Sequence, residues 1–124
     1  MAGLVQVPWY ATVLRQDALA LEICQAALVA LRYGATQYSV QRSRDDRYRI
    51  TQMVWFEDKN DWYRYWEGPE MTEFRRRNSG RYQIPVTYVW YDELASGALG
   101  PEVLLPEALP PEPEPQPEVT GQLS

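Results

Sequence analysis

The sequence predicts an α+β fold for one small domain, residues 1–97, followed by a tail of different composition, residues 98–124. Three observations support this prediction. Four segments have the alternation or apolar run of strands, two have helical spacing, and their order is strand, helix, strand, strand, helix, strand. Twelve of the 16 aromatic residues lie between Tyr48 and Tyr91. Rings this dense indicate either a large core or a cavity for a flat ligand.

The first strand is predicted at Val5 to Leu14, where apolar residues alternate with others and Val5, Val7 and Trp9 share one side. Asp17 is placed to cap the helix that follows, and Gly34 is placed to end it in a left-handed conformation. The apolar stripe of this helix is expected at Ala20, Cys24, Ala27, Leu28 and Leu31.

Cys24 is the single cysteine of the chain. An intrachain disulfide and a thiolate metal cluster are therefore excluded, which favours a reducing, cytoplasmic location. We expect this thiol to pack as a small hydrophobic group. The longest apolar run, Ala26 to Leu31, is too short to span a bilayer, so no membrane association is expected.

A hairpin is predicted from strands at Thr36 to Arg42 and Arg47 to Phe56, which flank a short polar run. Either Asp58 or Asn60 then caps a second helix, in which Trp62 and Trp66 are four residues apart on one face.

Gly68-Pro69 divides the second helix, because a proline inside a helix removes a hydrogen bond but suits the first turn of a new one. The new half is expected to end near Gly80. Arg75, Arg76, Arg77 and Arg81 form the single basic run of the chain. They are interpreted as cations at a helix C-terminus, and the alternative is an anion or carboxylate site.

The last strand is predicted at Tyr82 to Tyr91, at an edge or a bulge of the sheet because Pro85 interrupts its hydrogen bonding. The complete order is the split βαβ arrangement of ferredoxin-like domains. Helices cover one face of such a sheet, yet both faces here carry apolar groups, such as Val54 on one side and Trp55 on the other. The second face needs a cover, so we expect a homodimer.

The tail contains five glutamates and no basic residue, and seven of the ten prolines lie between Pro101 and Pro117. A segment of this composition is expected to be extended or disordered. It is a possible arm for a protein partner. Up to Gly97 the chain has 12 basic and 12 acidic residues, and this neutral body argues against nucleic-acid binding.

The element order, the two-faced sheet and the divided helix Trp62 to Met71 resemble the dimeric α+β barrel superfamily, and more narrowly its antibiotic biosynthesis monooxygenase-like branch. The resemblance covers Val5 to Asp92. It implies a cavity between sheet and helices, with Trp66 or Trp62 as the helix tryptophan that faces it. It also implies chemistry of the cofactor-free oxygenase, haem-degrading or isomerase kind.

The chain contains no histidine, and this narrows the chemistry. Serine or cysteine catalysis with histidine, a histidine-bound zinc and a proximal-histidine haem are excluded within it. The haem-degrading members of the family use an asparagine, tryptophan and histidine set, whereas this chain has no histidine and its first predicted strand carries no asparagine. We therefore expect no cofactor and no metal, and a reaction in which tyrosine or arginine orients a phenolate whose own electrons reduce oxygen.

Trp66, Tyr88 and Arg49 are the candidate catalytic residues. The candidate ligand-binding residues are Trp62, Tyr48, Tyr38 and Tyr82. Each has a structural alternative: the tryptophans as core, the tyrosines as hydrogen-bonded surface groups, and Arg49 or Arg47 as an ion pair with Glu57 or Asp92. Glu67 is either a desolvated general base or an exposed carboxylate.

Two functional classes remain open. In the first, the domain binds a small aromatic ligand and acts as a cofactor-free monooxygenase-like enzyme. In the second, it is a non-catalytic dimeric module whose tail tethers it to a partner. A cavity that reaches Trp66 and Tyr88 would favour the first class, and a solidly packed interior would favour the second.

Overall fold

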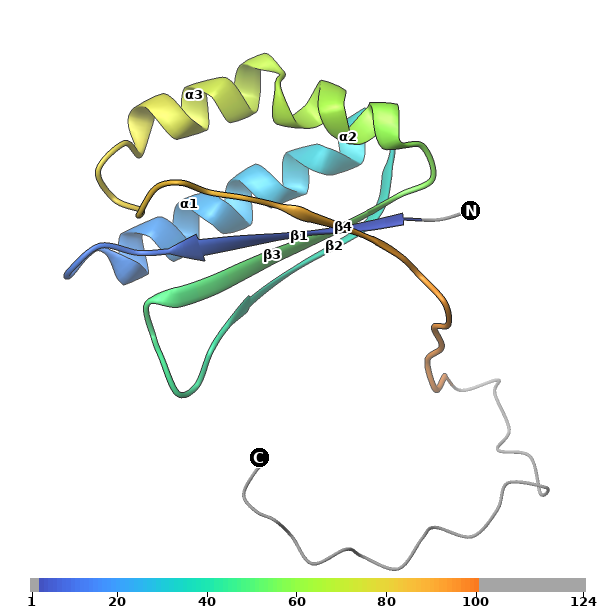
Figure 1. Ribbon diagram of the computed structural model, residues 1–124, viewed down its shortest axis with the longest axis horizontal. Coiled ribbons are helices and arrows are strands. Elements are labelled where there is room, and N and C mark those ends of the chain that lie inside the picture. The colour runs from blue at the N-terminus through green and yellow to red at the C-terminus, as the bar shows by residue number, and fades with distance from the viewer. Residues whose placement is uncertain (1–2, 101–124) are drawn as a thin grey trace, which may run out of the picture.

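The computed structural model describes residues 3–100, and the predicted tail from residue 101 onward lies outside the described residues. Four strands form one antiparallel sheet in the order β2-β3-β1-β4. Three helices lie against one face of this sheet, and the other face is open (Figure 1). This is the predicted ferredoxin-like α+β arrangement.

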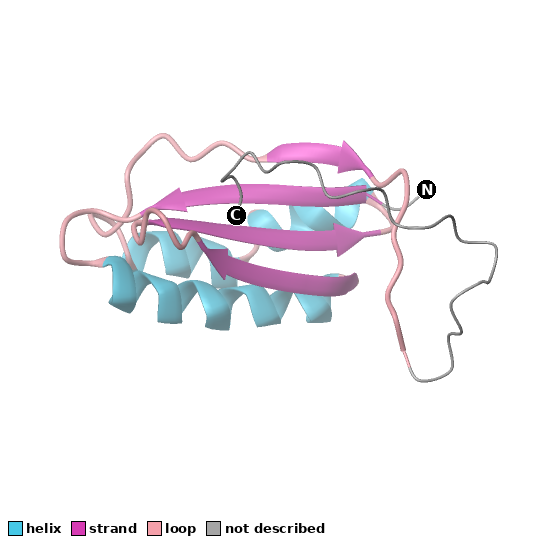
Figure 2. Cartoon of the chain, turned by 90° about the horizontal axis from the view of Figure 1, so that it is seen from below, coloured by secondary structure: helices cyan, strands magenta, loops and turns pink. Residues whose placement is uncertain are grey.

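Strand β1, Gly3–Tyr10, is central and pairs with both β3, Arg49–Phe56, and β4, Val89–Asp92. Strand β2, Ala35–Arg42, completes the predicted hairpin with β3 and forms one edge of the sheet. Figure 2 shows the sheet from its open face, with the helices behind it.

Helix α1, Gln16–Val29, continues into the 3-10 helix η1, Ala30–Tyr33, and ends at Gly34 with the expected left-handed φ of 104°. The predicted cap was wrong. The cap position is Arg15, and no side chain caps the helix. The Asp17 carboxylate instead accepts a hydrogen bond from the Arg42 guanidinium at 2.8 Å.

The predicted apolar stripe of α1 was right at Ala27 but wrong at Cys24, Leu28 and Leu31. The buried residues are Leu19, Ile23 and Ala27, followed by Ala30 in η1, whereas Leu28 is 52% exposed. Cys24 is exposed, not packed. The helix is apolar on nearly every side, so spacing alone did not distinguish the inner face from the outer one.

Helices α2, Lys59–Trp66, and α3, Pro69–Arg77, are the two halves of the predicted divided helix. The carboxylate of Asp58 caps α2 by accepting a hydrogen bond from the Asn60 backbone at 2.9 Å. Gly68 lies between the halves because a Cβ atom there would be 2.7 Å from the Arg64 carbonyl oxygen. Helix α3 ends at Arg77, before the expected Gly80.

The first and last strands are shorter than predicted. Strand β1 ends at Tyr10, and Leu14 has a positive φ of 64°. The last strand begins only at Val89, and before it the chain makes a single bridge between Tyr82 and Ala11. Pro85 lies in this irregular stretch, where its missing N–H removes a ladder hydrogen bond.

The core lies between the sheet and the helices. Its largest fully buried side chains include Trp9, Trp62, Tyr65, Phe56 and Phe74. The open face of the sheet is also partly apolar, as expected. The register places Leu4, Met53, Trp55, Val89 and Tyr91 on that side, opposite to the buried Val5 and Val54.

Candidate functional site

The two tryptophans of α2 form the centre of the candidate site. Trp62 and Trp66 stack with ring centroids 5.1 Å apart, as their spacing of one helical turn predicts. Trp62 is fully buried, whereas Trp66 is only partly buried. Trp66 is therefore the tryptophan of this pair with a surface that a ligand can contact.

Tyr88 and Tyr82 bring the irregular segment before β4 against these rings. The Tyr88 ring is 5.0 Å from Trp62 and 5.6 Å from Trp66. On the other side, Trp9 of β1 is 5.8 Å from Trp66 and 5.0 Å from Tyr82. We call Trp9, Trp62, Trp66, Tyr82 and Tyr88 the aromatic cluster. Four of its five members are candidate site residues from the sequence.

Arg75 completes the aromatic cluster from α3. Its guanidinium lies over the Trp66 ring, 4.6 Å from the ring centroid, and its Nη2 donates to the Trp66 carbonyl oxygen at 2.8 Å. The sequence reading assigned Arg75 to the helix C-terminus with the other arginines. The signal that identifies it is spacing, because it lies four residues after the buried Met71 and beside the buried Phe74.

Two buried donors beside Trp66 have no hydrogen-bond partner within the described residues. They are Nε1 of Trp62 and Nη1 of Arg75. Buried polar groups in folded proteins almost always have a partner, which is water or a ligand where the protein supplies none. Both donors can serve an oxygen acceptor, and the arginine can serve one with negative charge.

The sheet side of the cluster is anchored by a chain of buried hydrogen bonds. Nε1 of Trp9 donates to Oε1 of Gln52 at 3.0 Å, and Nε2 of Gln52 donates to the Tyr65 hydroxyl at 3.0 Å. The Tyr65 hydroxyl donates in turn to the Ala26 carbonyl at 2.6 Å. Burial raises the pKa of the Tyr65 hydroxyl, so it stays neutral and keeps its proton for this bond.

Three of the candidate residues lie away from the cluster. Arg49 is exposed and pairs in register with Tyr10 on the open face of the sheet. Tyr48 has its ring 6.5 Å from Tyr10, and Tyr38 is on the edge strand β2, separated from β1 by β3. The structure thus groups Trp62, Trp66, Tyr82 and Tyr88, with Arg75 in the position expected for Arg49.

The other charged candidates are at the surface. Arg47 forms an ion pair with Asp17, with 3.7 Å between Nη2 and Oδ1, and not with the predicted partners Glu57 or Asp92. Glu67 is exposed at the break between α2 and α3. Of the two alternatives for Glu67, its exposure favours the exposed carboxylate over the desolvated general base. No group of three histidine, cysteine or acidic residues within residues 3–100 is arranged to hold a metal ion.

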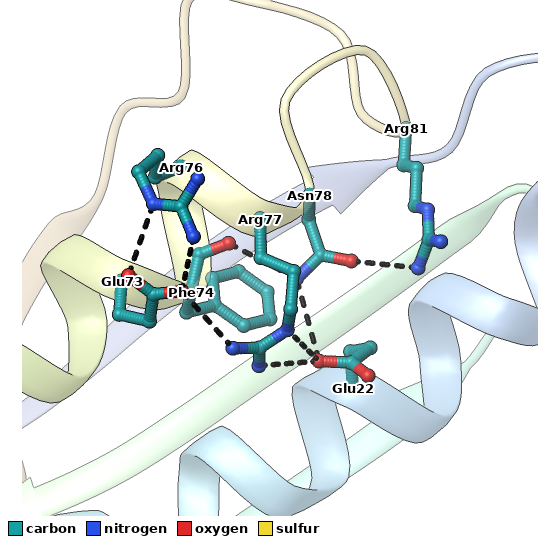
Figure 3. A network of polar contacts seen from close by, with 7 residues as sticks. All are labelled: Glu22, Glu73, Phe74, Arg76, Arg77, Asn78 and Arg81. Atoms are coloured by element: carbon teal, nitrogen blue, oxygen red, sulfur yellow. Dashed lines mark hydrogen bonds and ion pairs between the residues drawn. The ribbon is translucent and has the colours of Figure 1, made fainter.

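The remaining arginines of α3 form the polar network in Figure 3. Arg76 pairs with Glu73 at 2.6 Å, and Arg77 donates to Glu22 of α1 at 2.7 Å. The buried Asn78 donates to the Phe74 carbonyl at 3.0 Å and accepts from Arg81 at 3.0 Å. Arg77 and Asn78 thus connect the end of α3 to Glu22 of α1, whereas the pair between Arg76 and Glu73 lies within α3.

Three pockets formed by described residues lie outside the aromatic cluster. One, of about 390 Å³, lies between α1 and α3. Another, of about 250 Å³, lies beside Lys59 and Trp90, and the third, of about 490 Å³, lies beside Trp55 and Glu93. None of these three includes Trp66 or Tyr88.

Searches with the sequence find no matching family model and no matching curated protein. Solved structures do match the fold. A candidate antibiotic biosynthesis monooxygenase from Nitrosomonas europaea superposes with a TM-score of 0.69 at 16% identity, covering 75% of this chain and 90% of that one. The chain therefore has the fold of antibiotic biosynthesis monooxygenase-like proteins, as the sequence resemblance implied.

Two further structures support this assignment of the fold. SnoaB, a cofactor-independent oxygenase from Streptomyces nogalater, matches with a TM-score of 0.66 at 9% identity, covering 77% of this chain and 95% of that one. A candidate antibiotic biosynthesis monooxygenase from Bordetella bronchiseptica matches with a TM-score of 0.66 at 14% identity, covering 76% of this chain and 98% of that one. No helix among the described residues is long and apolar enough to cross a membrane.

Proposed function

We propose that this protein binds a small, flat phenolic ligand at the aromatic cluster and acts on it as a cofactor-free monooxygenase-like enzyme. The observation that carries the proposal is the pair of unpartnered buried donors, Trp62 Nε1 and Arg75 Nη1, which belong to the two residues packed against the partly exposed Trp66. The fold shared with SnoaB, a cofactor-independent oxygenase, agrees with it.

Each residue of the cluster has a proposed role. Trp66 and Tyr88 supply ring faces and edges for an aromatic ligand, since offset and edge-to-face contacts are the favoured geometries between rings. Trp62 and Arg75 donate to a phenolate oxygen. Tyr82 and Tyr88 belong to the irregular segment before β4, which lacks a sheet ladder and is the part of the wall that moves to admit the ligand.

The proposed reaction converts a phenol into a quinone with molecular oxygen as the co-substrate. Arg75 stabilises the phenolate, whose electron-rich ring carbon transfers electrons to oxygen. One oxygen atom bonds to that carbon, which becomes a carbonyl. The other leaves as water with the hydrogen from the carbon and the phenol proton. The substrate supplies all the electrons. The site therefore has to bind the phenolate, orient it toward oxygen and exclude bulk water.

A homodimer formed through the open face of the sheet is part of this proposal. Leu4, Met53, Trp55, Val89 and Tyr91 lie on that face, and Val89 and Tyr91 are 46% and 45% exposed. A contiguous apolar face on a soluble protein is usually covered by a binding partner. We also propose a cytoplasmic location and a binding role for the tail, both on composition alone.

A non-catalytic dimeric module remains the second candidate, favoured by one observation. The rings of the cluster are already in contact, and the three described pockets lie elsewhere. In that case the rings are only core, and the two unpartnered donors hold water.

Thermal shift with a panel of hydroxylated polycyclic compounds separates the two candidates. We expect at least one compound to stabilise the protein, with the effect reduced in Trp66→Phe and in Arg75→Met but kept in Tyr63→Phe, a change on the exposed side of α2. Oxygen consumption with the bound compound then tests the reaction. No stabilisation by any compound would support the non-catalytic module.

A further inference from the structure

Aromatic rings continue from the aromatic cluster through the core to η1. The ring centroids of Trp66 and Trp62 are 5.1 Å apart, and those of Trp62 and Tyr65 are 5.6 Å apart. Tyr65 in turn lies 5.9 Å from Tyr33. We call these four residues the ring series. Its two ends, Trp66 and Tyr33, are partly buried, whereas the two rings between them are fully buried. The ring series therefore connects the cluster to a second, partly exposed position.

The Tyr33 end of the ring series has a proton acceptor. Its hydroxyl donates a hydrogen bond to Oε1 of Glu70 at 2.5 Å. This hydrogen bond raises the pKa of the Tyr33 hydroxyl and lowers the pKa of the Glu70 carboxyl, so the proton stays on the tyrosine in the resting protein. A phenol that loses an electron becomes a much stronger acid. A carboxylate within hydrogen-bond reach then accepts its proton.

The other tyrosines that contact the tryptophans of the cluster have no such acceptor. The Tyr65 hydroxyl donates to a backbone carbonyl, and burial raises the pKa of the Tyr82 hydroxyl. Among the described residues, the hydrogen bonds from a tyrosine hydroxyl to a carboxylate are those of Tyr33 and Tyr10. The neighbouring ring of Tyr10 is that of Tyr48, which is outside the cluster. Tyr33 thus combines contact with the ring series and a carboxylate partner.

We propose that the ring series conducts single electrons from Tyr33 to Trp66. An oxidising radical formed at the aromatic cluster is then moved to Tyr33 and does not remain in the core. The oxidant is a peroxyl radical in contact with Trp66, the partly exposed tryptophan of the stacked pair. The final reductant is a thiol in solution, which reaches Tyr33 because this residue is only partly buried.

Each electron and proton of the proposed step has a place to go. The peroxyl radical takes one electron from the Trp66 indole and one proton from water, and becomes a hydroperoxide. Trp62 gives an electron to the oxidised Trp66. Tyr33 gives one to Trp62, with the Tyr65 ring as the bridge between them. The O–H bond of Tyr33 breaks as its proton moves to Glu70, which leaves a neutral tyrosyl radical. Glu70 returns the proton to water, and the thiol restores the tyrosine by giving it a hydrogen atom.

This function goes beyond the proposed oxygenase reaction. It requires no ligand in the cluster, because any oxidant that takes an electron from Trp66 starts the same transfer. A phenolate that reacts with oxygen at the cluster is one source of the peroxyl radical. An experiment that supplies the oxidant from outside therefore tests electron transfer separately from ligand binding.

Pulse radiolysis of the full chain in azide solution tests the proposal, because the azide radical oxidises tryptophan in preference to tyrosine near neutral pH. A nitroso spin trap captures the resulting tyrosyl radical, and peptide mass spectrometry locates it. Trp66→Phe removes the entry to the ring series, and Trp55→Phe is its control, because Trp55 is also partly buried but lies on β3 outside the series. Glu70→Gln removes the proton acceptor, and Glu73→Gln is the control on the same helix. Circular dichroism confirms that each variant is folded.

We expect the adduct on Tyr33 of the wild type to exceed that on Tyr10 at least fivefold, although both hydroxyls donate to a carboxylate at 2.5 Å. Trp66→Phe and Glu70→Gln should each lower the Tyr33 adduct at least fivefold, and the two controls should leave it unchanged. An equal amount of Tyr33 adduct in Trp66→Phe would mean that Tyr33 is oxidised directly from solution. Adducts on Tyr82 or Tyr88 in place of Tyr33 would mean that the radical leaves by another route. Either result overturns the proposal.

The optical decay of the tryptophan radical provides a second measurement that needs no trap. In the wild type it should be first order and independent of protein concentration, as transfer within one molecule requires. Tyr33→Phe, which keeps the ring but cannot form a tyrosyl radical, should slow the decay at least fivefold. Equal decay rates in Tyr33→Phe and wild type would show that Tyr33 is not the electron donor.

Discussion

The guanidinium of Arg75 lies over the indole ring of Trp66 and donates a hydrogen bond to the backbone carbonyl of the same residue at 2.8 Å. Trp66 is the last residue of α2, so this bond satisfies a carbonyl that the helix leaves free at its end. One side chain thus joins α3 to α2 across the break at Gly68. It also supports the tryptophan at the centre of the aromatic cluster.

Arg75→Met should lower the free energy of unfolding by about 1–2 kcal/mol, from the lost cation–π contact and the lost hydrogen bond to a carbonyl. The methionine keeps most of the apolar stem. Urea denaturation followed by tryptophan fluorescence measures the change. Arg76→Met is the matched control, with an expected effect below about 0.5 kcal/mol because its ion pair with Glu73 is exposed. Equal losses in both variants would contradict the role of Arg75.

Gly68→Ala should destabilise the protein by about 1–3 kcal/mol, as overpacking does at a crowded site. The added Cβ would lie 2.7 Å from the Arg64 carbonyl oxygen and 2.9 Å from the Tyr33 hydroxyl oxygen. Neither a helix carbonyl nor a ring held by Glu70 can move freely. Differential scanning calorimetry gives the shift in melting temperature. Gly97→Ala, where no atom lies within 4 Å of the new Cβ, should melt as wild type does.

The fold was predictable because each helix or strand with an apolar face has to bury that face against another element, which leaves few possible arrangements. The strands β2 and β3, the cap at Asp58 and the division at Gly68 all follow from local chemistry in the sequence. Helix α1 was harder. Leu19 and Ile23 compete with Leu21 and Leu28 for the inner face, and both sets have helical spacing. The choice depends on packing against the sheet, which no local pattern records.

The candidate site was predictable only in part, for a similar reason. Trp62, Trp66, Tyr82 and Tyr88 were selected from aromatic density, and the structure groups them. Arg49 was selected instead of Arg75 because it alternates with apolar strand residues. Its face of the sheet is the open one, where a charge can remain hydrated, whereas Arg75 follows the buried side of α3.

Gln52→Leu should cost about 1–3 kcal/mol, although leucine is the more apolar residue. The substitution removes the acceptor of Trp9 Nε1 and leaves that donor buried without a partner. It also removes the donor to the Tyr65 hydroxyl. Urea denaturation measures the loss. Gln41→Leu, at an exposed position of β2, should change stability by less than about 0.5 kcal/mol. A neutral Gln52→Leu would show that the Trp9 donor finds another partner.

Glu22 should make the stability of the protein sensitive to acid. The hydrogen bond from the Arg77 guanidinium lowers the pKa of this carboxyl below its usual value, and Asn78 contributes further. A carboxyl whose pKa is lower in the folded state stabilises the protein above its unfolded pKa, about 4.3, and loses this contribution as the pH falls through the folded pKa.

Glu22→Gln should therefore reduce the free energy of unfolding by about 1 kcal/mol at pH 7. The difference from wild type should shrink as the pH falls below the unfolded pKa and through the lowered folded pKa, because wild-type Glu22 then becomes protonated too. Urea midpoints measured from pH 7 to pH 3 follow both proteins. Glu67→Gln, at an exposed carboxyl outside the ion pairs of the described residues, is the control and should follow wild type throughout. A difference between Glu22→Gln and wild type that stays constant with pH would mean that the glutamate acts through packing and not through its charge.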